Sequence, residues 1–520
     1  MKETTNMKNK MKTTSAIRRF LIVGMMVSCS LQPLKSAAQV GHAQNQPTQD
    51  EKMAWFREAK FGLFINMGVY SQLGGVYQGK KQPGGSSEWI MNIMKIPVAE
   101  YRKVASDFNI VNYNADAWCE LAKEAGMKYI VFDAKHHDGF ALFKTKASKW
   151  NIVDATPYKK DPLEDLSKAC KKHGLKLGIY YSHCQDWVNP GGAAADRYAS
   201  HILEKNATPE ERAQAAKIDT FIRANNNHWD PEQTSKTFED YYNTVALVQM
   251  EELLTNYGRI DYFWFDTPRS ITPDLTQKTE QLLKRLQPHI LINDRLGIGR
   301  HRGDVSTPER VVPPFDQLNG GDWESCQTMN TAWGWKSWDH NWKDVKYFVS
   351  TLAEITGKGG NFLLNVGPKP DGAFPQESID RLKQIGVWMK VNSEAIYGVK
   401  ANPLTPVAWG ALSKKDDKNG NTTLYASIFT WPENNEIVLL GLKQKVTRAT
   451  FLANGKEVKN SLSENGLKIS LPDEAPDNVV TVIKLEVAGH IPDRVFDKNA
   501  KFIHPNSLKK GKAKAVDMDE

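Results

Sequence analysis

The sequence predicts a (β/α)8-like, TIM-type barrel followed by a C-terminal antiparallel β-sandwich. Three observations lead to this fold class. Between residues 52 and 400, apolar runs alternate with helical patterns, and the runs are apolar on both faces, as in buried parallel strands. Polar residues follow the ends of these runs. From Pro403 onward, the pattern changes to short strands separated by turns.

The expected barrel elements follow one another in βα order. Strands are predicted at residues 61–65, 128–132, 175–181, 260–265, 289–293 and 362–366. Helices are predicted at residues 115–126, 162–174, 238–257, 276–286 and 345–356. A repeat of this length favours a closed barrel over an open sheet. Residues 190–236 are polar and alanine-rich, and we interpret them as an insertion on the catalytic face.

The C-terminal part is expected to form a separate domain at residues 401–488. Its strands are predicted at residues 424–430, 437–442, 448–452, 467–471 and 479–486. Asn-Gly turns, such as Asn454-Gly455 and Asn465-Gly466, lie among them. This pattern is typical of an antiparallel sandwich. Residues 489–520 are interpreted as a C-terminal appendage.

The N-terminus has the pattern of an export signal. Basic residues precede an apolar run at residues 20–27, which is too short to span a bilayer. Ser36-Ala37-Ala38 forms a small-residue cleavage site, so we predict a signal peptide at residues 1–38 and a flexible leader at 39–51. Lipoprotein processing at Cys29 is the alternative. The protein is therefore expected in the periplasm, secreted or anchored at the surface, without a membrane span.

Charge and motif content argue against several classes of function. The net charge is +8, but much of the excess lies in the two terminal segments, without interleaved aromatics, so we expect no nucleic-acid partner. No GxGxxG or GxxxxGK[ST] loop follows any strand, which argues against nucleotide chemistry. The cysteines after the signal are widely spaced and predict buried thiols, with no zinc site. They are Cys119, Cys170, Cys184 and Cys326. No metal or organic cofactor is expected.

Polar residues at the predicted strand ends mark the candidate site, because the carboxyl ends of barrel strands line the active-site mouth. They are Asn66, His136, His137, Ser182, His183, Asp266, Asp294 and Arg295. Asp266 ends an aromatic strand, where a carboxylate is costly to bury without partners, and we interpret it as a nucleophile.

Retaining glycoside hydrolysis needs a second carboxyl group about 5–5.5 Å from the nucleophile. Glu309 lies in a turn-rich loop, and Glu324 has apolar neighbours that would raise its pKa. The residues alone leave both open as the acid/base. Adjacent residues on an extended chain point to opposite sides, so His136 and His137 are not expected to share a metal. Neutral imidazoles would instead form hydrogen bonds with sugar hydroxyl groups.

Several motifs in the same order resemble the retaining α-L-fucosidases, glycoside hydrolase family 29, from about residue 52 to 488. They are Lys60-Phe61-Gly62-Leu63-Phe64, Ser87-Glu88-Trp89, Ala134 to Phe140, Gly178 to Ser182, Trp264-Phe265-Asp266, Asn293-Asp294-Arg295, Thr307-Pro308-Glu309, Trp323-Glu324, Trp333-Gly334-Trp335 and Gly359 to Pro368. The last of these is the most specific stretch.

The resemblance implies an exo-acting, retaining hydrolase that releases terminal α-L-fucose from an oligosaccharide or glycoconjugate. It implies Asp266 as nucleophile and Glu309 as acid/base, with Glu324 as the second choice. The residues implied to hold the sugar are Asn66, Glu88, Trp89, His136, His137, Tyr181, Trp264, Arg295 and Trp335. The oligomeric state stays open.

One departure from the family pattern affects the expected sugar pocket. The family's first strand usually ends in His-Trp-Gly, whereas this chain has Asn66-Met67-Gly68. Asn has a shorter reach and Met has no stacking face, so a reshaped or enlarged pocket is one hypothesis. The departure therefore leaves two alternatives to an α-L-fucosidase. One is an exo-glycosidase for a related sugar such as an α-L-galactoside, and the other is a carbohydrate-binding relative without catalysis.

Overall fold

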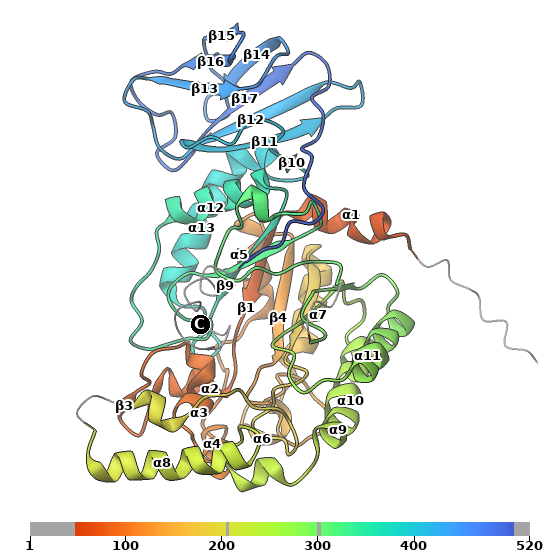
Figure 1. Cartoon of the computed structure of the whole chain (residues 1–520), viewed down its shortest axis with the longest axis vertical. Helices are drawn as coiled ribbons and strands as arrows, with labels where there is room; N and C mark the ends of the chain where they lie inside the picture. Colours follow the sequence, from red (N-terminus) through yellow and green to blue (C-terminus); the bar gives the residue numbers. More distant parts are fainter. Residues whose placement is uncertain (1–46, 204–206, 299–302, 504–520) are drawn as a thin grey trace, which may run out of the picture. The chain divides into compact units, whose positions relative to one another are not determined.

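The computed structural model describes residues 47–203, 207–298 and 303–503 (Figure 1). The expected signal peptide and most of the leader lie outside these residues, as do Cys29 and the last part of the appendage. Of the helices within the described ranges, none is both long and apolar enough to cross a bilayer. The cysteines at positions 119, 170, 184 and 326 are buried and free, as expected.

A sheet of parallel strands forms the centre of the N-terminal part. Within the described residues it contains β1 (Phe61–Ile65), β4 (Tyr129–Lys135), β5 (Lys176–Tyr181), β6 (Tyr262–Phe265), β7 (Leu291–Ile292), β8 (Glu324–Thr328) and β9 (Asn361–Val366). Their order is β7-β6-β5-β4-β1-β9-β8. All six predicted strands are present. The polar strand β8 was not predicted, because it has no apolar run.

The segment 305–309 joins the two outer strands of this sheet. Asn293, just after β7, forms a parallel bridge with Val305, and Ser306 forms one with Trp323, just before β8. Further along, Glu309 bridges Cys326 within β8. The segment therefore takes the place of an eighth strand, and the curled sheet with this segment confirms the TIM-like barrel.

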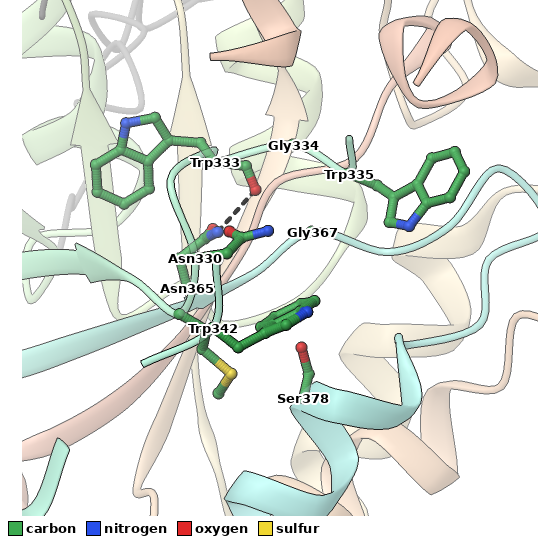
Figure 2. Close-up of a pocket in the computed structure, with 9 residues that line it drawn as sticks. Asn330, Trp333, Gly334, Trp335, Trp342, Asn365, Gly367 and Ser378 are labelled. Carbon is green, nitrogen blue, oxygen red and sulfur yellow. Dashed lines mark hydrogen bonds between the residues drawn. The ribbon is translucent and has the colours of Figure 1, made fainter. Parts of the chain in front are cut away.

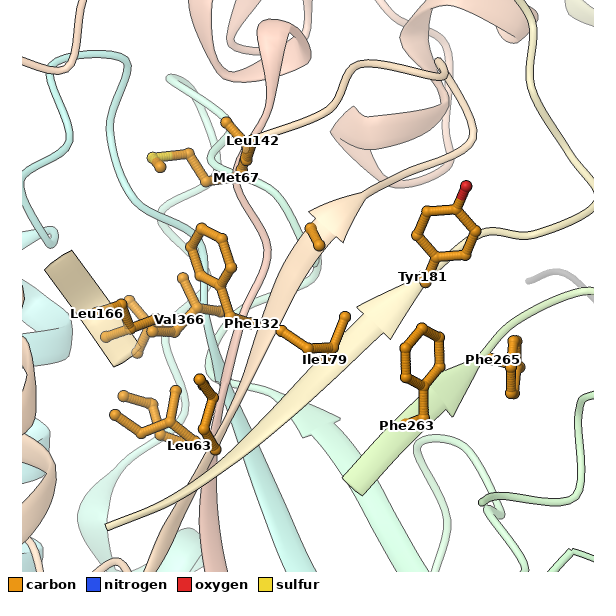
Figure 3. Close-up of a cluster of buried hydrophobic side chains, with 14 of the residues drawn as sticks. Leu63, Met67, Phe132, Leu142, Leu166, Ile179, Tyr181, Phe263, Phe265 and Val366 are labelled. Carbon is orange, nitrogen blue, oxygen red and sulfur yellow. The ribbon is translucent and has the colours of Figure 1, made fainter. Parts of the chain in front are cut away.

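Side chains alternate between the two faces of the barrel strands, as strand geometry requires. The inner cluster includes Phe64, Tyr129, Tyr180, Trp264 and Leu363. The residues between them belong to the larger outer cluster, which Figure 3 shows in part. Two layers of apolar side chains, one inside and one outside, explain why the strands have no polar face in the sequence.

Helices cover the outer face. They include α5 (Ala115–Glu124), α7 (Pro162–His173), α11 (Pro273–Leu286), α12 (Val345–Gly357) and α13 (Gln376–Asn392). The buried residues of α1 (Gln49–Ala59) belong instead to the inner cluster. Helix α7 begins where the side chain of Asp161 accepts hydrogen bonds from the Leu163 and Glu164 amides, with Pro162 in the first turn. Gly174 ends it in a left-handed conformation, φ 71°.

Shorter elements connect the barrel. They are α2 (Val69–Leu73), β2 (Val76–Tyr77), β3 (Lys80–Lys81), α3 (Ile90–Ile93), α4 (Val98–Val104) and α6 (Ile152–Ala155). The helix predicted at 238–257 is divided into α9 (Phe238–Tyr241), a π-helical turn (Tyr242–Ala246) and α10 (Leu247–Asn256). The segment predicted as an insertion contains α8 (Pro209–Ala224).

Two antiparallel sheets form the C-terminal part. Strands β10 (Lys400–Ala401), β11 (Gly410–Asp416), β12 (Thr422–Ile428), β17 (Thr481–Val487) and β14 (Val446–Phe451) form one sheet in this order. Strands β13 (Glu436–Leu440), β16 (Gly466–Ser470) and β15 (Asn460–Ser463) form the other. Leu424, Leu439, Leu467 and Leu485 are buried in one common core, which confirms the β-sandwich.

Candidate active site

Asp266 lies directly after β6, at the carboxyl end of the strand, where several donors reach it. Its Oδ1 accepts hydrogen bonds from the Arg295 guanidinium at 2.7 Å and from the Thr267 amide at 2.8 Å. Its Oδ2 accepts one from the Tyr180 hydroxyl at 2.8 Å. These bonds fix the carboxylate in one orientation at the barrel mouth.

A second carboxylate, Glu309, lies beside Asp266 on the segment that joins β7 and β8. The same Nη1 atom of Arg295 that contacts Asp266 also donates to Glu309 Oε2, at 3.1 Å. The two carboxylate oxygens are therefore separated by no more than the sum of 2.7 and 3.1 Å. This limit is compatible with the spacing of about 5–5.5 Å that retaining glycosidases use.

Arg295 is held in place from three directions. Its Nε and Nη2 donate to the hydroxyl and the carbonyl oxygen of Thr307, at 3.0 and 2.9 Å. Its guanidinium carbon lies 4.7 Å from the centre of the Trp264 ring, in a cation–π contact. The planar fork therefore has a fixed position, and its remaining nitrogen is directed at both carboxylates.

The two histidines lie together at the site, which differs from the expectation that they point to opposite sides. Their ring centres are 4.2 Å apart, because β4 ends at Lys135 and the chain turns at the histidines, with the Gly139 amide donating to the His136 carbonyl at 3.0 Å. Burial lowers the pKa of both rings, so both are neutral at ordinary pH. His137 Nε2 lies 3.6 Å from Asp266 Oδ2, and His136 stacks on Tyr180 at 5.1 Å.

Glu88 and Trp89 lie beside these histidines. Glu88 Oε2 accepts hydrogen bonds from Ser86 and from the Gly334 amide, at 2.7 and 3.0 Å. Its Oε1 is buried without a hydrogen-bond partner within the described ranges, and burial raises the pKa of the carboxyl group. The Trp89 ring lies 4.9 Å from His137. Buried polar atoms without partners are rare, and here they suit a polar ligand.

Matches with known proteins agree with this arrangement. The model of the alpha-L-fucosidase family matches residues 29–394, and the model of the alpha-L-fucosidase C-terminal domain matches residues 405–486. The chain belongs to the alpha-L-fucosidase family.

Relatives of the fucosidase cover almost its whole length. The alpha-L-fucosidase of Dictyostelium discoideum is 25% identical over 89% of this chain and 95% of its own. The human plasma alpha-L-fucosidase is 28% identical over 81% and 85%. Alpha-L-fucosidase isoenzyme 1 from Paenibacillus thiaminolyticus is 33% identical, with a TM-score of 0.70 over 85% of this chain and 99% of that one.

A further solved structure bears on the mechanism. It is an alpha-L-fucosidase GH29 from Bacteroides thetaiotaomicron, trapped as a covalent intermediate with 2-fluoro-fucosyl fluoride. It is 28% identical, with a TM-score of 0.70 over 85% of this chain and 98% of that one. The fucosidase described here is accordingly a retaining glycoside hydrolase that releases fucose, and an enzyme for another sugar or a binding protein without catalysis is not favoured.

Glu324 does not lie at the mouth of the fucosidase barrel. Glu324 is the first residue of β8, at the end of the strand opposite the site, and it is fully buried in the barrel. Its Oε1 accepts a hydrogen bond from the Trp264 indole at 3.2 Å, and Oε2 accepts one from the Tyr129 hydroxyl. Burial raises the pKa of Glu324 to about 7. Glu324 therefore contacts Trp264 from inside the barrel, whereas Glu309 lies beside Asp266.

The tyrosine assignment also needs correction. Tyr180 donates to Asp266, whereas the Tyr181 hydroxyl donates to Gln249 at 2.7 Å, on the outer side of the sheet. Figure 3 shows Tyr181 with Phe263 and Phe265 in the outer cluster. Because both strand faces are apolar, the residue pattern does not indicate which tyrosine faces inward.

Met67 and Asn66 differ from what the sequence suggested. Met67 is buried in the outer cluster with Leu142 (Figure 3). Asn66 follows β1 on the inner side and donates to Asn365 Oδ1 at 2.6 Å.

Trp335 follows Gly334, whose amide donates to Glu88. It lines a small cavity with Trp333, Trp342 and Asn365, and Figure 2 shows its ring directed away from that of Trp333. Trp333, not Trp335, packs against the inner residue Phe64, at 5.8 Å. Within the described residues, no group of three or more metal-type side chains is arranged to hold an ion.

Proposed function

We propose that Asp266 is the nucleophile and Glu309 the acid/base of this retaining fucosidase. The observation that carries the assignment is the shared contact of both carboxylates with Nη1 of Arg295. It keeps the two carboxylates close enough to be compatible with the separation that a double displacement needs. Glu309 is also the more exposed of the two, with 31% against 13% of its side chain accessible, as suits a group that meets leaving groups and water.

The proposed reaction has two steps. An oxygen of Asp266 attacks the anomeric carbon while the bond from that carbon to the leaving oxygen breaks, and Glu309 transfers its proton to the leaving oxygen. Glu309 then takes a proton from a water molecule, whose oxygen attacks the anomeric carbon and releases Asp266. Two inversions give α-L-fucose with its configuration retained.

The sugar would be held by the polar groups around Asp266. His137 offers only its Nε2, because its Nδ1 is hydrogen-bonded to the Ser182 hydroxyl at 2.7 Å. Neutral His136 offers its Nδ1 and Glu88 its Oε1, which have no partner within the described residues. Trp89, Trp264, Asn66 and Arg295 complete the proposed pocket, with Tyr180 in place of Tyr181. The substrate class would be fucosylated oligosaccharides or glycoconjugates, cleaved from the non-reducing end.

Aryl glycosides test the proposed assignment. The enzyme should release 4-nitrophenol from the α-L-fucoside in preference to the α-L-galactoside, the β-D-galactoside and the β-D-fucoside. Asp266→Ala should remove nearly all of this activity. Glu309→Gln should slow poor leaving groups far more than good ones, whereas its matched control Glu324→Gln should slow both alike. The acid/base assignment would be reversed if the rate depended steeply on the leaving group in Glu324→Gln and did not depend on it in Glu309→Gln.

We further propose that the enzyme is exported, to the periplasm or beyond, as the N-terminal pattern suggests. Mass spectrometry of the mature protein tests this. A first residue of Gln39 would support signal cleavage, an acylated Cys29 would place the enzyme on a lipid surface, and an intact Met1 in the cytoplasmic fraction would contradict export.

A further inference from the structure

A buried carboxyl group, Asp133, lies at the floor of the site and is not used by the mechanism above. Tyr129 and Val131 of β4 point into the barrel, and Ile130 and Phe132 point outward. The alternation therefore directs Asp133 inward, one layer above Val131. In the β4–β5 register Asp133 is the partner of Tyr180, whose hydroxyl contacts Asp266.

One oxygen of Asp133 has a partner and the other has none. Oδ2 accepts a hydrogen bond from the Tyr70 hydroxyl at 2.9 Å. Oδ1 is buried and, in the part of the chain that the structure describes, has no hydrogen-bond partner. The residue itself is fully buried. A buried polar atom left unpaired costs about 1–3 kcal/mol, so its persistence calls for a ligand.

The charges around Asp133 decide its protonation. Burial is the main cause that raises its pKa well above the usual range, and the nearby carboxylates Asp138, Glu88 and Asp266 raise it further. The hydrogen bond from Tyr70 acts in the opposite direction, but the net shift favours the neutral carboxylic acid. Because Oδ2 accepts from Tyr70, the acid proton belongs on Oδ1. The open atom of Asp133 is thus an O–H donor.

The surroundings of Asp133 indicate what this donor meets. The Tyr70 side chain, whose hydroxyl contacts Asp133, lies with its ring 5.6 Å from that of His136. His136 in turn stacks on Tyr180, whose hydroxyl contacts Asp266, so Asp133 lies beside the proposed sugar-binding residues. Glu88 Oε1 and His136 Nδ1 are likewise buried without partners within the described ranges. Three unpaired polar atoms of different chemistry around one site match the donors and acceptors of a sugar's hydroxyl groups.

We propose that Asp133 is a substrate-binding residue, whose Oδ1–H group donates a hydrogen bond to one ring hydroxyl of the fucosyl unit held at Asp266. This inference rests on the proposed function of the site. It adds a specificity determinant: the sugar must present a hydroxyl oxygen at this position, and a sugar without it would leave the buried donor unpaired.

A double-mutant cycle between protein and substrate tests the inference. Asp133→Leu and the wild type are compared on 4-nitrophenyl α-L-fucoside and on its 2-, 3- and 4-deoxy analogues. For one analogue, loss of the hydroxyl should lower kcat/KM of the wild type on the order of tenfold but leave Asp133→Leu almost unaffected. The other two analogues should cost both enzymes the same factor. The inference would be overturned if, for each of the three analogues, loss of the hydroxyl lowered kcat/KM of the two enzymes by the same factor.

Two further variants separate binding from a structural role. Asp133→Asn places an N–H donor where Oδ1–H lies, so it should lose less activity than Asp133→Leu and keep the dependence on the same hydroxyl. Tyr70→Phe removes only the other hydrogen bond of the carboxyl group and should also keep that dependence. A purely structural Asp133 would instead lower activity on all four substrates by one common factor.

Other outcomes remain informative. Should Asp133→Leu fail to fold, calorimetric binding of L-fucose to Asp133→Asn, Asp133→Ala and the wild type replaces the cycle. Weakening by about tenfold in Asp133→Ala and by less in Asp133→Asn supports the inference, and equal affinities overturn it. Absence of wild-type activity on the α-L-fucoside would refute the proposed function itself, whereas full activity with equal deoxygenation costs would refute only the role of Asp133.

Discussion

Arg295 joins both carboxylates of the site through one nitrogen atom, and Thr307 fixes the rest of its fork. Lysine has a single point charge and no fork, so it cannot keep these contacts together. We expect Arg295→Lys to lower kcat/KM by about 100-fold, since hydrogen bonds to charged groups contribute about 1.5–3 kcal/mol each. The measurement is steady-state kinetics on an aryl α-L-fucoside.

Arg381→Lys is the control, because Arg381 on the outer helix α13 donates to the backbone carbonyl oxygens of Lys343 and Glu377 and lies over the Trp342 ring. It should leave activity unchanged. Activity of Arg295→Lys within threefold of the wild type would contradict a clamping role for Arg295.

Because of Glu324, we expect part of the free energy of unfolding to depend on pH. Its pKa in the folded protein is about 7, above the ordinary 4.5. The neutral form therefore stabilises the fold fully below about pH 4.5, and this contribution is lost as the pH rises through 7. Glu324→Gln keeps a neutral side chain at every pH. Relative to the wild type, it should become more stable between pH 5 and pH 8, on the order of 3 kcal/mol.

Urea unfolding at the two pH values measures this change. The exposed residue Glu377 on α13 offers the matched control Glu377→Gln, whose stability difference from the wild type should not vary with pH. A constant difference for Glu324→Gln would show that Glu324 is ionised in the folded protein.

The orientation of strand β5 can be tested, because Tyr180 and Tyr181 are adjacent and face opposite sides. Tyr180→Phe removes the hydrogen bond to Asp266 and should lower kcat about tenfold or more. Tyr181→Phe removes the bond to Gln249 and should lower stability by about 1 kcal/mol with kcat unchanged. Kinetics and thermal unfolding of both variants distinguish the two faces, and the reverse result would invert the orientation of β5.

Most elements of the barrel could be predicted from the sequence, because buried parallel strands form continuous apolar runs. Strand β1 was predicted with its bounds at residues 61–65, and Asp266 was placed at a strand end for the same reason. Strand β8 was missed because Glu324, Ser325, Gln327 and Thr328 are polar although buried.

The side of a strand on which a residue lies could not be predicted where both faces are apolar. Tyr181 was chosen over Tyr180, and Met67 was expected in the pocket, for this reason. Glu324 was considered because its apolar neighbours resemble those of a catalytic acid, but only the three-dimensional register shows that it begins its strand. Asp133 was missed because it lies inside an apolar run.

At the scale of the whole molecule, one sheet of the sandwich has two buried faces. On β17 and just before it, Val480 and Val482 belong to the hydrophobic cluster of the barrel, whereas Ile483 and Leu485 belong to the sandwich core. The indole of Trp388 on α13 donates to the Val480 carbonyl at 2.8 Å. The two parts, predicted as domains at 52–400 and 401–488, therefore share buried surface.

This shared surface predicts that barrel and sandwich unfold together. Val482→Ala removes two buried methyl groups at the shared face and should destabilise the enzyme by about 2 kcal/mol. Leu439→Ala in the sandwich core lies away from the barrel and tests cooperativity. If the unit is cooperative, both variants lower the temperature of inactivation together with that of a single calorimetric transition. Independent domains would instead give two calorimetric transitions. Leu439→Ala would then lower the temperature of one transition, and the temperature at which activity on the α-L-fucoside is lost would stay that of the wild type.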